Sequence, residues 1–202
     1  MISRSLVFAF LLNVSALAPA SACTLTDIPC ADFDGDLPPP AVLEAFNVGW
    51  KSEASSLANA RYVSLFNAAA HSGDKRLYLI DLERRSVERY HVAHGRGSDP
   101  DHDGYATDFS DVPQSKKTPL GFFITAETYT GRHGHSLRLD GLEARNRNAR
   151  SRAIVIHGAD YVSPALEKMG RSWGCPALDN GVSRDVIERI KGGSLLYIYA
   201  VP

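Results

Sequence analysis

Short runs of apolar and β-branched residues, separated by turn-forming residues, make up most of the chain after residue 60. Such runs are typical of β-strands. They occupy residues 62–66, 77–82, 87–92, 121–126, 136–139, 153–157 and 194–200. Because turn signals at residues 72–74 and 83–85 separate the first three runs, the succession favours a meander or a barrel over βαβ units. We therefore expect a mainly β fold.

Two helices are predicted beside the strands. Residues 41–58 carry apolar side chains at the spacing of one helix face, and Pro40 suits the first turn of such a helix. Residues 182–191 are predicted to form a second helix, which ends at a pair of glycines. The preceding stretch 24–40 is rich in turn residues and ends in consecutive prolines. Such a stretch is typical of a linker or of an arm packed on the domain.

The start of the chain has the composition of a secretory signal peptide. Arg4 supplies the positive charge, residues 6–14 supply a short apolar run, and residues 20–22 match an A-x-A cleavage site. The run is too short to span a membrane, and no second run of spanning length follows. We therefore expect a periplasmic protein with no transmembrane segment in its mature chain. Its signal peptide, linker or N-terminal arm, and single domain are expected at residues 1–22, 23–40 and 41–202.

Length and charge narrow the class of protein. The chain has 202 residues, enough for one domain with a sizeable core, and a net charge of −1. No stripe of basic residues interleaved with aromatic residues occurs, so nucleic acid is not an expected partner.

Three cysteines are present, Cys23, Cys30 and Cys175. In the oxidising compartment that a signal peptide implies, Cys23 and Cys30 are expected to form a disulfide, which leaves Cys175 as an odd thiol. The alternative fate of Cys23 is lipidation as the first residue of the mature chain, although the residues before it lack the leucine of a usual lipobox. An odd thiol in an exported protein points to a reactive role.

The odd cysteine has a candidate partner in His157. Residues 153–156 are predicted to form a buried strand that delivers His157 to its end, and Cys175 follows Gly174 at a tight bend. A thiol becomes nucleophilic as the thiolate, and a nearby imidazole is the usual base near neutral pH. Cys175 and His157 are therefore candidates for nucleophile and general base, and the N–H groups of Gly174 and Cys175 for an oxyanion hole. The alternative is a small buried cysteine and a structural histidine.

The residues around this pair resemble a known family. The strings IHGADYVS at residues 156–163 and GRSWGCPAL at residues 170–178 resemble the L,D-transpeptidase (YkuD-type) catalytic domain. They are most similar to a subgroup with Ser-Trp-Gly-Cys-Pro-Ala. The resemblance covers about residues 76 to 200 and includes AHGRGS, LGFF and GHSLRL at residues 93–98, 120–123 and 134–139. It implies a β-sandwich or barrel with a few short helices.

The resemblance also assigns roles. His157 matches the family's base, Cys175 matches its nucleophile, and the carbonyl of Gly158 matches the acceptor that orients the base. Asp160 is the side-chain alternative for that acceptor. Substrate or oxyanion contacts are assigned to Arg171, Ser172, Trp173, Gly174 and His133.

Two positions depart from the family pattern. Trp173 stands where the family usually has histidine, and Pro176-Ala177 replaces the stretch that usually brings an arginine. Arg171 is the nearest replacement for that arginine, whose role is to contact a substrate carboxylate.

The function that the resemblance implies is cross-linking of peptidoglycan stem peptides without a cofactor. Cys175 would form a thioester with diaminopimelate of a tetrapeptide donor, and the amine of a second stem would resolve the thioester. Carbapenems, which acylate this family, would act as inhibitors. The register of the cross-link, three-to-three or one-to-three, stays open. Alternatives are an L,D-carboxypeptidase with water as the acceptor, a sortase-like transpeptidase and a non-catalytic cell-wall-binding domain.

Two metal sites were weighed against simpler interpretations. The string DPDHDG at residues 99–104 imitates the start of a calcium loop, but Ser110 occupies the twelfth position, where an acid is needed. On a strand, His133 and His135 would share a face, as two zinc ligands need, but no third ligand follows by spacing. A solvated acidic loop and a histidine near the catalytic groove are the preferred interpretations, so no metal is expected.

Lys116 and Lys117 lie near the end of the long loop 95–119. They are either solvated or near an anionic substrate.

Overall fold

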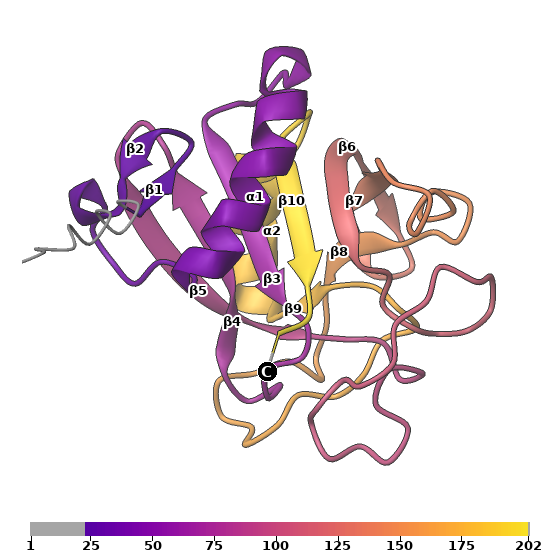
Figure 1. Cartoon of the computed structure of the whole chain (residues 1–202). Helices are drawn as coiled ribbons and strands as arrows, with labels where there is room; N and C mark the ends of the chain where they lie inside the picture. The colour runs from indigo at the N-terminus through magenta and orange to yellow at the C-terminus, as the bar shows by residue number, and fades with distance from the viewer. Residues whose placement is uncertain (1–22, 202) are drawn as a thin grey trace, which may run out of the picture.

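Eight strands form a closed barrel in the order β10-β3-β4-β5-β9-β8-β7-β6 (Figure 1). The computed structural model describes residues 23–201, so the expected signal peptide lies outside the described residues. The barrel strands are β3 (Tyr62–Asn67), β4 (Lys75–Asp81), β5 (Ser86–Ala93), β6 (Gly121–Gly131), β7 (Gly134–Gly141), β8 (Val155–Gly158), β9 (Ala177–Leu178) and β10 (Leu195–Tyr199). Only the pairs β10–β3 and β8–β9 are parallel. The prediction of a mainly β barrel with few helices is confirmed.

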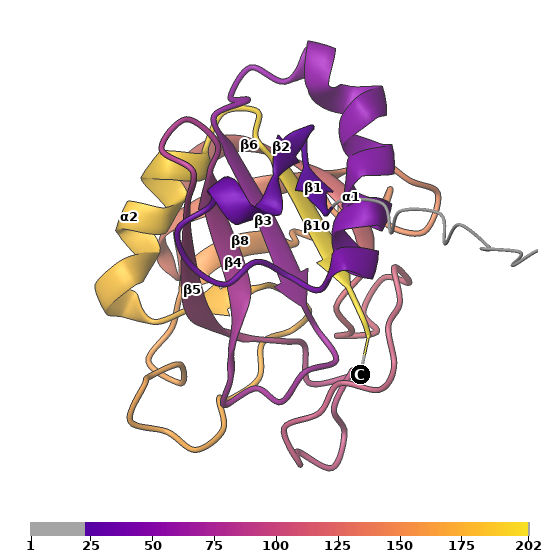
Figure 2. The ribbon, with the colours of Figure 1, turned by 60° about the vertical axis from the view of Figure 1, so that its left-hand side comes forward.

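Two helices pack on opposite faces of the sheet. Helix α1 (Pro40–Glu53) crosses β3 and β10 on one face, and α2 (Asn180–Ile190) lies behind them (Figures 1 and 2). Alternation along β10 explains this arrangement: Leu195 and Tyr199 pack with α1, whereas Leu196 and Ile198 join the cluster that includes α2. Among residues 23–201 no helix combines the length and apolar character needed to cross a membrane.

Some strands and helices begin or end at other residues than the sequence predicts. These differences occur where no pattern of buried apolar residues marks the end of the element. Strand β6 continues to Gly131 because its polar end pairs with β7 in a hairpin. Strand β9 has two residues, too few for any periodicity. Helix α1 ends at Glu53 and is followed by a 3-10 turn, Ala54–Ser56.

The segment before α1 is tied to the barrel. Strands β1 (Thr24–Leu25) and β2 (Ile28–Pro29) form a small hairpin, which precedes the 3-10 turn Cys30–Asp32. A disulfide joins Cys23 to Cys30, so the sulfur of Cys23 cannot carry a lipid while this bond is intact. The Asn47 side chain of α1 accepts a hydrogen bond from Thr26 N–H and donates one to the carbonyl of Thr24, both at 2.8 Å.

A buried arginine fixes the start of the long loop after β5. The Arg76 guanidinium is 1% exposed and donates to the carbonyls of Val92, Ala68 and Ala70. It also lies 2.9 Å from Nδ1 of His94, whose Nε2 lies 3.1 Å from Asp99 Oδ2. Burial lowers the pKa of Arg76 to about 9 and that of His94 to about 4. We infer that neutral His94 accepts from Arg76 and donates to Asp99.

Replacing Arg76 tests this anchor. Arg76→Met removes the donors to three carbonyls, of which those of Val92 and Ala68 are buried, so we expect the free energy of unfolding to fall by roughly 3 kcal/mol. Urea denaturation measures the loss. Arg84→Met is the matched control, because the Arg84 side chain is 77% exposed; its effect should stay within about 0.5 kcal/mol. Equal stability of the two variants would contradict the anchoring role.

Candidate active site

Strands β8 and β9 bring the candidate nucleophile and base into one region. Their parallel register pairs His157 with Ala177 and Gly158 with Leu178. Cys175 precedes β9 by two residues, so it lies beside the start of β8. Strand β9 also pairs with β5 through Ala177 and Ala93, which holds the cysteine-bearing turn from both sides.

The turn that carries Cys175 is closed by a serine hydroxyl. Ser172 Oγ donates to the carbonyl of Cys175 at 2.6 Å and accepts from the N–H of Gly174 at 3.0 Å. Gly174 has a φ of +121°, and an added Cβ would lie 2.7 Å from the carbonyl oxygen of Lys117. Glycine is therefore required here by both conformation and space.

This hydrogen bond bears on the predicted oxyanion hole. The N–H of Gly174 donates to Ser172 Oγ in this arrangement of the turn, and its role as an oxyanion donor stays a prediction. The N–H of Cys175 makes no hydrogen bond within the described part of the chain. Ser172 acts on the shape of the turn, with its own N–H donating to the carbonyl of His94.

The thiol of Cys175 is half-buried and lies beside Ala153, at the edge of a pocket. Its Sγ lies 3.5 Å from the carbonyl oxygen of Ala153, which accepts the thiol proton. Burial raises the pKa of the Cys175 thiol. The backbone N–H of Val155 and the positive charge of Arg152 oppose that rise in pKa. At neutral pH the resting form is therefore the thiol.

The His157 imidazole is 2% exposed and fixed in one tautomer. Its Nδ1 lies 2.8 Å from the carbonyl oxygen of Gly158, so Nδ1 carries the proton and Nε2 is free to accept one. Asp160, the side-chain alternative, accepts from the amide of Asn180 instead. Burial lowers the pKa of His157, the bond to Gly158 opposes this effect, and the charge of His133 adds to it.

His133 covers the base. It lies in the turn between β6 and β7, and its ring stacks on that of His157 with centroids 4.2 Å apart. The expectation that His133 and His135 share a strand face is wrong, because His133 lies in the turn. His135 instead forms an ion pair with Glu188, so the two histidines do not act together on a metal.

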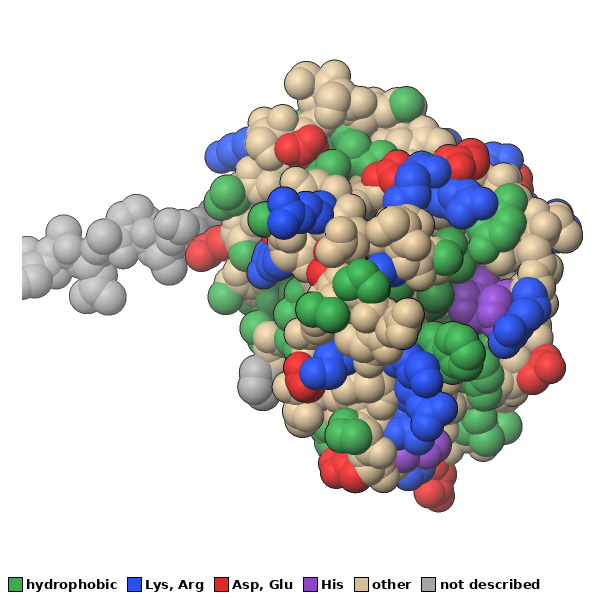
Figure 3. Space-filling model, turned by 90° about the vertical axis from the view of Figure 1, so that its right-hand side faces the viewer, with side chains coloured by type: hydrophobic (Ala, Val, Ile, Leu, Met, Phe, Trp, Pro, Cys, Tyr) green, Lys and Arg blue, Asp and Glu red, His purple; other side chains and the backbone are tan. Residues whose placement is uncertain are grey.

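A pocket of about 320 Å³ joins these groups. Figure 3 shows its side of the molecule, where histidine reaches the surface between basic and hydrophobic side chains. The residues that line the pocket are Tyr129, Arg132, His133, Arg152, Ala153, Val155, His157, Tyr161, Arg171, Ser172, Trp173 and Cys175. Arg132, Arg152 and Tyr161 also line the pocket but were not predicted as site residues, because no motif marks them. Nearness in sequence to the two catalytic candidates is the one signal that Arg152 and Tyr161 carry.

Arg171 and Trp173 both line this pocket. The Arg171 side chain is held by hydrogen bonds, whereas the Trp173 side chain is largely exposed. The Nη1 of Arg171 donates to the carbonyls of Asp99 and Pro100. Trp173 is 63% exposed, with Lys116 Nζ at 5.0 Å from its ring centroid.

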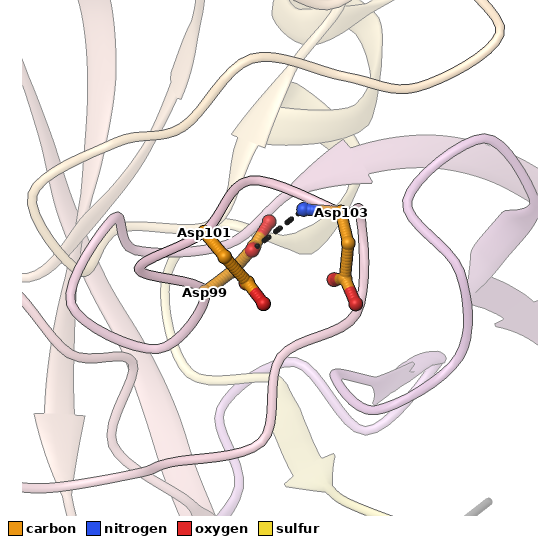
Figure 4. A group of neighbouring side chains, drawn as sticks. All are labelled: Asp99, Asp101 and Asp103. Atoms are coloured by element: carbon orange, nitrogen blue, oxygen red, sulfur yellow. Dashed lines mark hydrogen bonds between the residues drawn. The ribbon is translucent and has the colours of Figure 1, made fainter.

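Three aspartates of the acidic loop at residues 99–104 lie close together. Asp99, Asp101 and Asp103 are the one group among the described residues whose side chains converge as metal ligands do (Figure 4). Asp99 is already engaged: it accepts from the backbone N–H groups of Asp103 and Gly104 and bonds His94. These bonds explain the cluster as a folded turn.

A family model described as the L,D-transpeptidase catalytic domain matches residues 39–199. No curated protein matches the chain. Solved structures with a similar fold include an L,D-transpeptidase from Mycobacterium smegmatis, with a TM-score of 0.44 and 12% identity over 69% of this chain and 59% of that chain. An L,D-transpeptidase from Mycobacterium tuberculosis H37Rv has a TM-score of 0.45 and 14% identity, over 69% and 57%.

A third similar structure is Pgp2, the helical cell shape determining protein from Campylobacter jejuni. Its TM-score is 0.46 with 14% identity, over 70% of this chain and 48% of that chain. The chain thus spans between 48% and 59% of the length of these three structures.

The stack of His133 on His157 predicts a titration. We expect the pKa of His157 to lie below its ordinary value of 6.5 and to rise in His133→Asn, because a positive neighbour disfavours the protonated imidazole. Proton or carbon NMR of the histidine rings measures the titration midpoint of His157 in the wild-type protein and in His133→Asn. His135→Asn is the control on the same hairpin and should leave the His157 midpoint in place. A lower His157 midpoint in His133→Asn would contradict the prediction that His133 lowers the pKa of His157.

Proposed function

The chain belongs to the L,D-transpeptidase catalytic domain family, and from this premise we propose that it is an exported cysteine transpeptidase acting on peptidoglycan stem peptides. The observation that carries the proposal is the hydrogen bond from Nδ1 of His157 to the carbonyl of Gly158. It leaves Nε2 as a free base, in the same pocket as the thiol of Cys175. A thiol and a neutral imidazole are the two groups that acyl transfer through a thioester requires.

In the first half-reaction, Cys175 turns from Ala153 and gives its proton to Nε2 of His157. Its sulfur bonds to the carbonyl carbon of the donor peptide, with diaminopimelate as the proposed residue. Collapse of the tetrahedral adduct breaks the C–N bond, and His157 passes the proton to the departing amine. A thioester and a free D-alanine result.

The developing oxyanion needs a donor. The N–H of Cys175 is the free backbone donor beside the thiol, and this supports its role in stabilising the adduct. The N–H of Gly174 joins it only if its bond to Ser172 opens.

In the second half-reaction, the amine of another stem attacks the thioester and gives a proton to His157. The C–S bond breaks as the new amide forms, and the thiolate recovers the proton. With water as the acceptor, the same site would act as an L,D-carboxypeptidase. No step draws on a metal or a nucleotide, since thioester chemistry is complete with thiol and base.

The disulfide between Cys23 and Cys30 supports export, because disulfides persist in oxidising compartments such as the periplasm. The proposed signal peptide at residues 1–22 precedes this bond. A domain at residues 41–202 with a packed N-terminal arm at 23–40 is the organisation that goes with this proposal. A non-catalytic cell-wall-binding domain is the second candidate, favoured by the thiol's raised pKa and its hydrogen bond to Ala153.

A carbapenem distinguishes these candidates. We expect intact mass spectrometry to show one drug-sized adduct on the wild-type protein and none on Cys175→Ala. His157→Gln should slow acylation by on the order of 10² to 10⁴. An adduct that persists in Cys175→Ala would mean that another residue is the nucleophile. An unmodified wild-type protein that also resists iodoacetamide would support the binding domain.

A further inference from the structure

The pocket around Cys175 is lined by positive charge only. Its charged lining residues are Arg132, Arg152 and Arg171, and neither aspartate nor glutamate lines it. A neighbouring hollow of about 650 Å³, which shares Arg152 and Trp173 with it, adds Lys116 and again no acid. An anionic ligand is therefore favoured over a neutral one.

Two of the three arginines are occupied by the protein itself. Arg152 is 4% exposed, pairs with Asp111, and donates to the carbonyls of Ser110 and Lys117. Arg171 uses its Nη1 on two backbone carbonyls. Arg152 is thus engaged by the long loop after β5, and Arg171 is engaged through Nη1.

Arg132 is the free one. Within residues 23–201 its guanidinium has no hydrogen bond and no ion pair, and the residue is exposed. Its guanidinium carbon lies 6.0 Å from the centroid of the Trp173 ring. An aromatic ring supplies no oxygen acceptor, so the N–H groups of Arg132 stay available for a carboxylate.

The position of Arg132 indicates which carboxylate it would bind. Arg132 precedes His133 in the β6–β7 turn, and His133 stacks on His157. In the proposed reaction His157 gives its proton to the amine of the departing residue. The α-carboxylate of that residue is one carbon away from this amine, so it would lie on the hairpin side of the imidazole.

We propose that Arg132 binds the free α-carboxylate of the substrate's C-terminal residue and so selects donors that end at the leaving residue. This inference rests on the proposed function, because the leaving residue is defined by it. Arg132 thereby takes the task of the arginine that the segment after Cys175 lacks. A donor extended by a further residue, or capped as an amide, would lose this contact.

Binding tests the assignment without catalysis. Calorimetry on Cys175→Ala compares a stem tetrapeptide ending in D-alanine with the same peptide as its C-terminal carboxamide. We expect the acid to bind about 10- to 100-fold more tightly, as a hydrogen-bonded charge pair allows. Adding Arg132→Gln should remove that preference, and Arg132→Lys should leave part of it, because lysine keeps the charge but loses the two-point geometry.

Arg84→Gln in the same background is the control for an arginine at the distant β4–β5 turn and should keep the full preference. Three outcomes would each overturn the proposal. The first is an undiminished preference for the acid in Arg132→Gln, and the second is a preference that is lost in Arg171→Gln but kept in Arg132→Gln. The third is equal binding of acid and amide before any arginine is changed. Failure of the proposed function is separate: it would appear as no carbapenem adduct and no turnover with Cys175 intact, whatever the binding preference.

Discussion

The parallel pairing of β8 with β9 is the constraint on which the site depends. It sets His157 beside Ala177 and therefore brings Cys175, two residues earlier, to the start of β8. A parallel pair cannot be closed by a tight turn, so the connection between the two strands must travel away and return. That connection packs its own small core, in which Val162 and Met169 are buried against Ala93 of β5. The separation of the two reactive groups is thus a property of the whole barrel rather than of one loop.

Burial acts on the two reactive groups in opposite directions. It raises the pKa of the Cys175 thiol and lowers that of the His157 imidazole, so both groups are neutral at rest. In the proposed mechanism the thiolate forms as substrate is engaged, and the positive charge of Arg152 favours it. A resting thiol suits the oxidising compartment proposed for this chain, because oxidation proceeds through the thiolate and a strongly depressed pKa would expose the site to it.

The fold was largely predictable, and the site only in part. Strands such as β3 and β4 were found because burial on one or both faces imposes a pattern on the residues. Cys175 and His157, which line one pocket, could be singled out as candidates because their chemistry is rare and local motifs frame them. The two-residue strand β9 has no pattern to detect. The hydrogen bond from the N–H of Gly174 to the Ser172 hydroxyl could not be predicted, because residue spacing does not show which way that hydroxyl points. Arg132 and Arg152 enter the pocket by tertiary contacts, which no single segment encodes.

The β6–β7 hairpin joins reactivity to selectivity in adjacent residues. Its turn carries His133, whose ring stacks on that of His157, and Arg132, whose guanidinium approaches the ring of Trp173. Trp173 is the aromatic ring beside this turn. Lys116 and Arg132 both approach its ring, at 5.0 and 6.0 Å, and the aromatic surface lets two cations lie near one another without an acid between them. A carboxylate placed on the hydrogen-bonding edge of Arg132 would then meet a cation that the protein has positioned but not neutralised. The proposed selectivity for a free terminal carboxylate rests on that unneutralised charge, and on a pocket lining that includes no acidic side chain among residues 23–201.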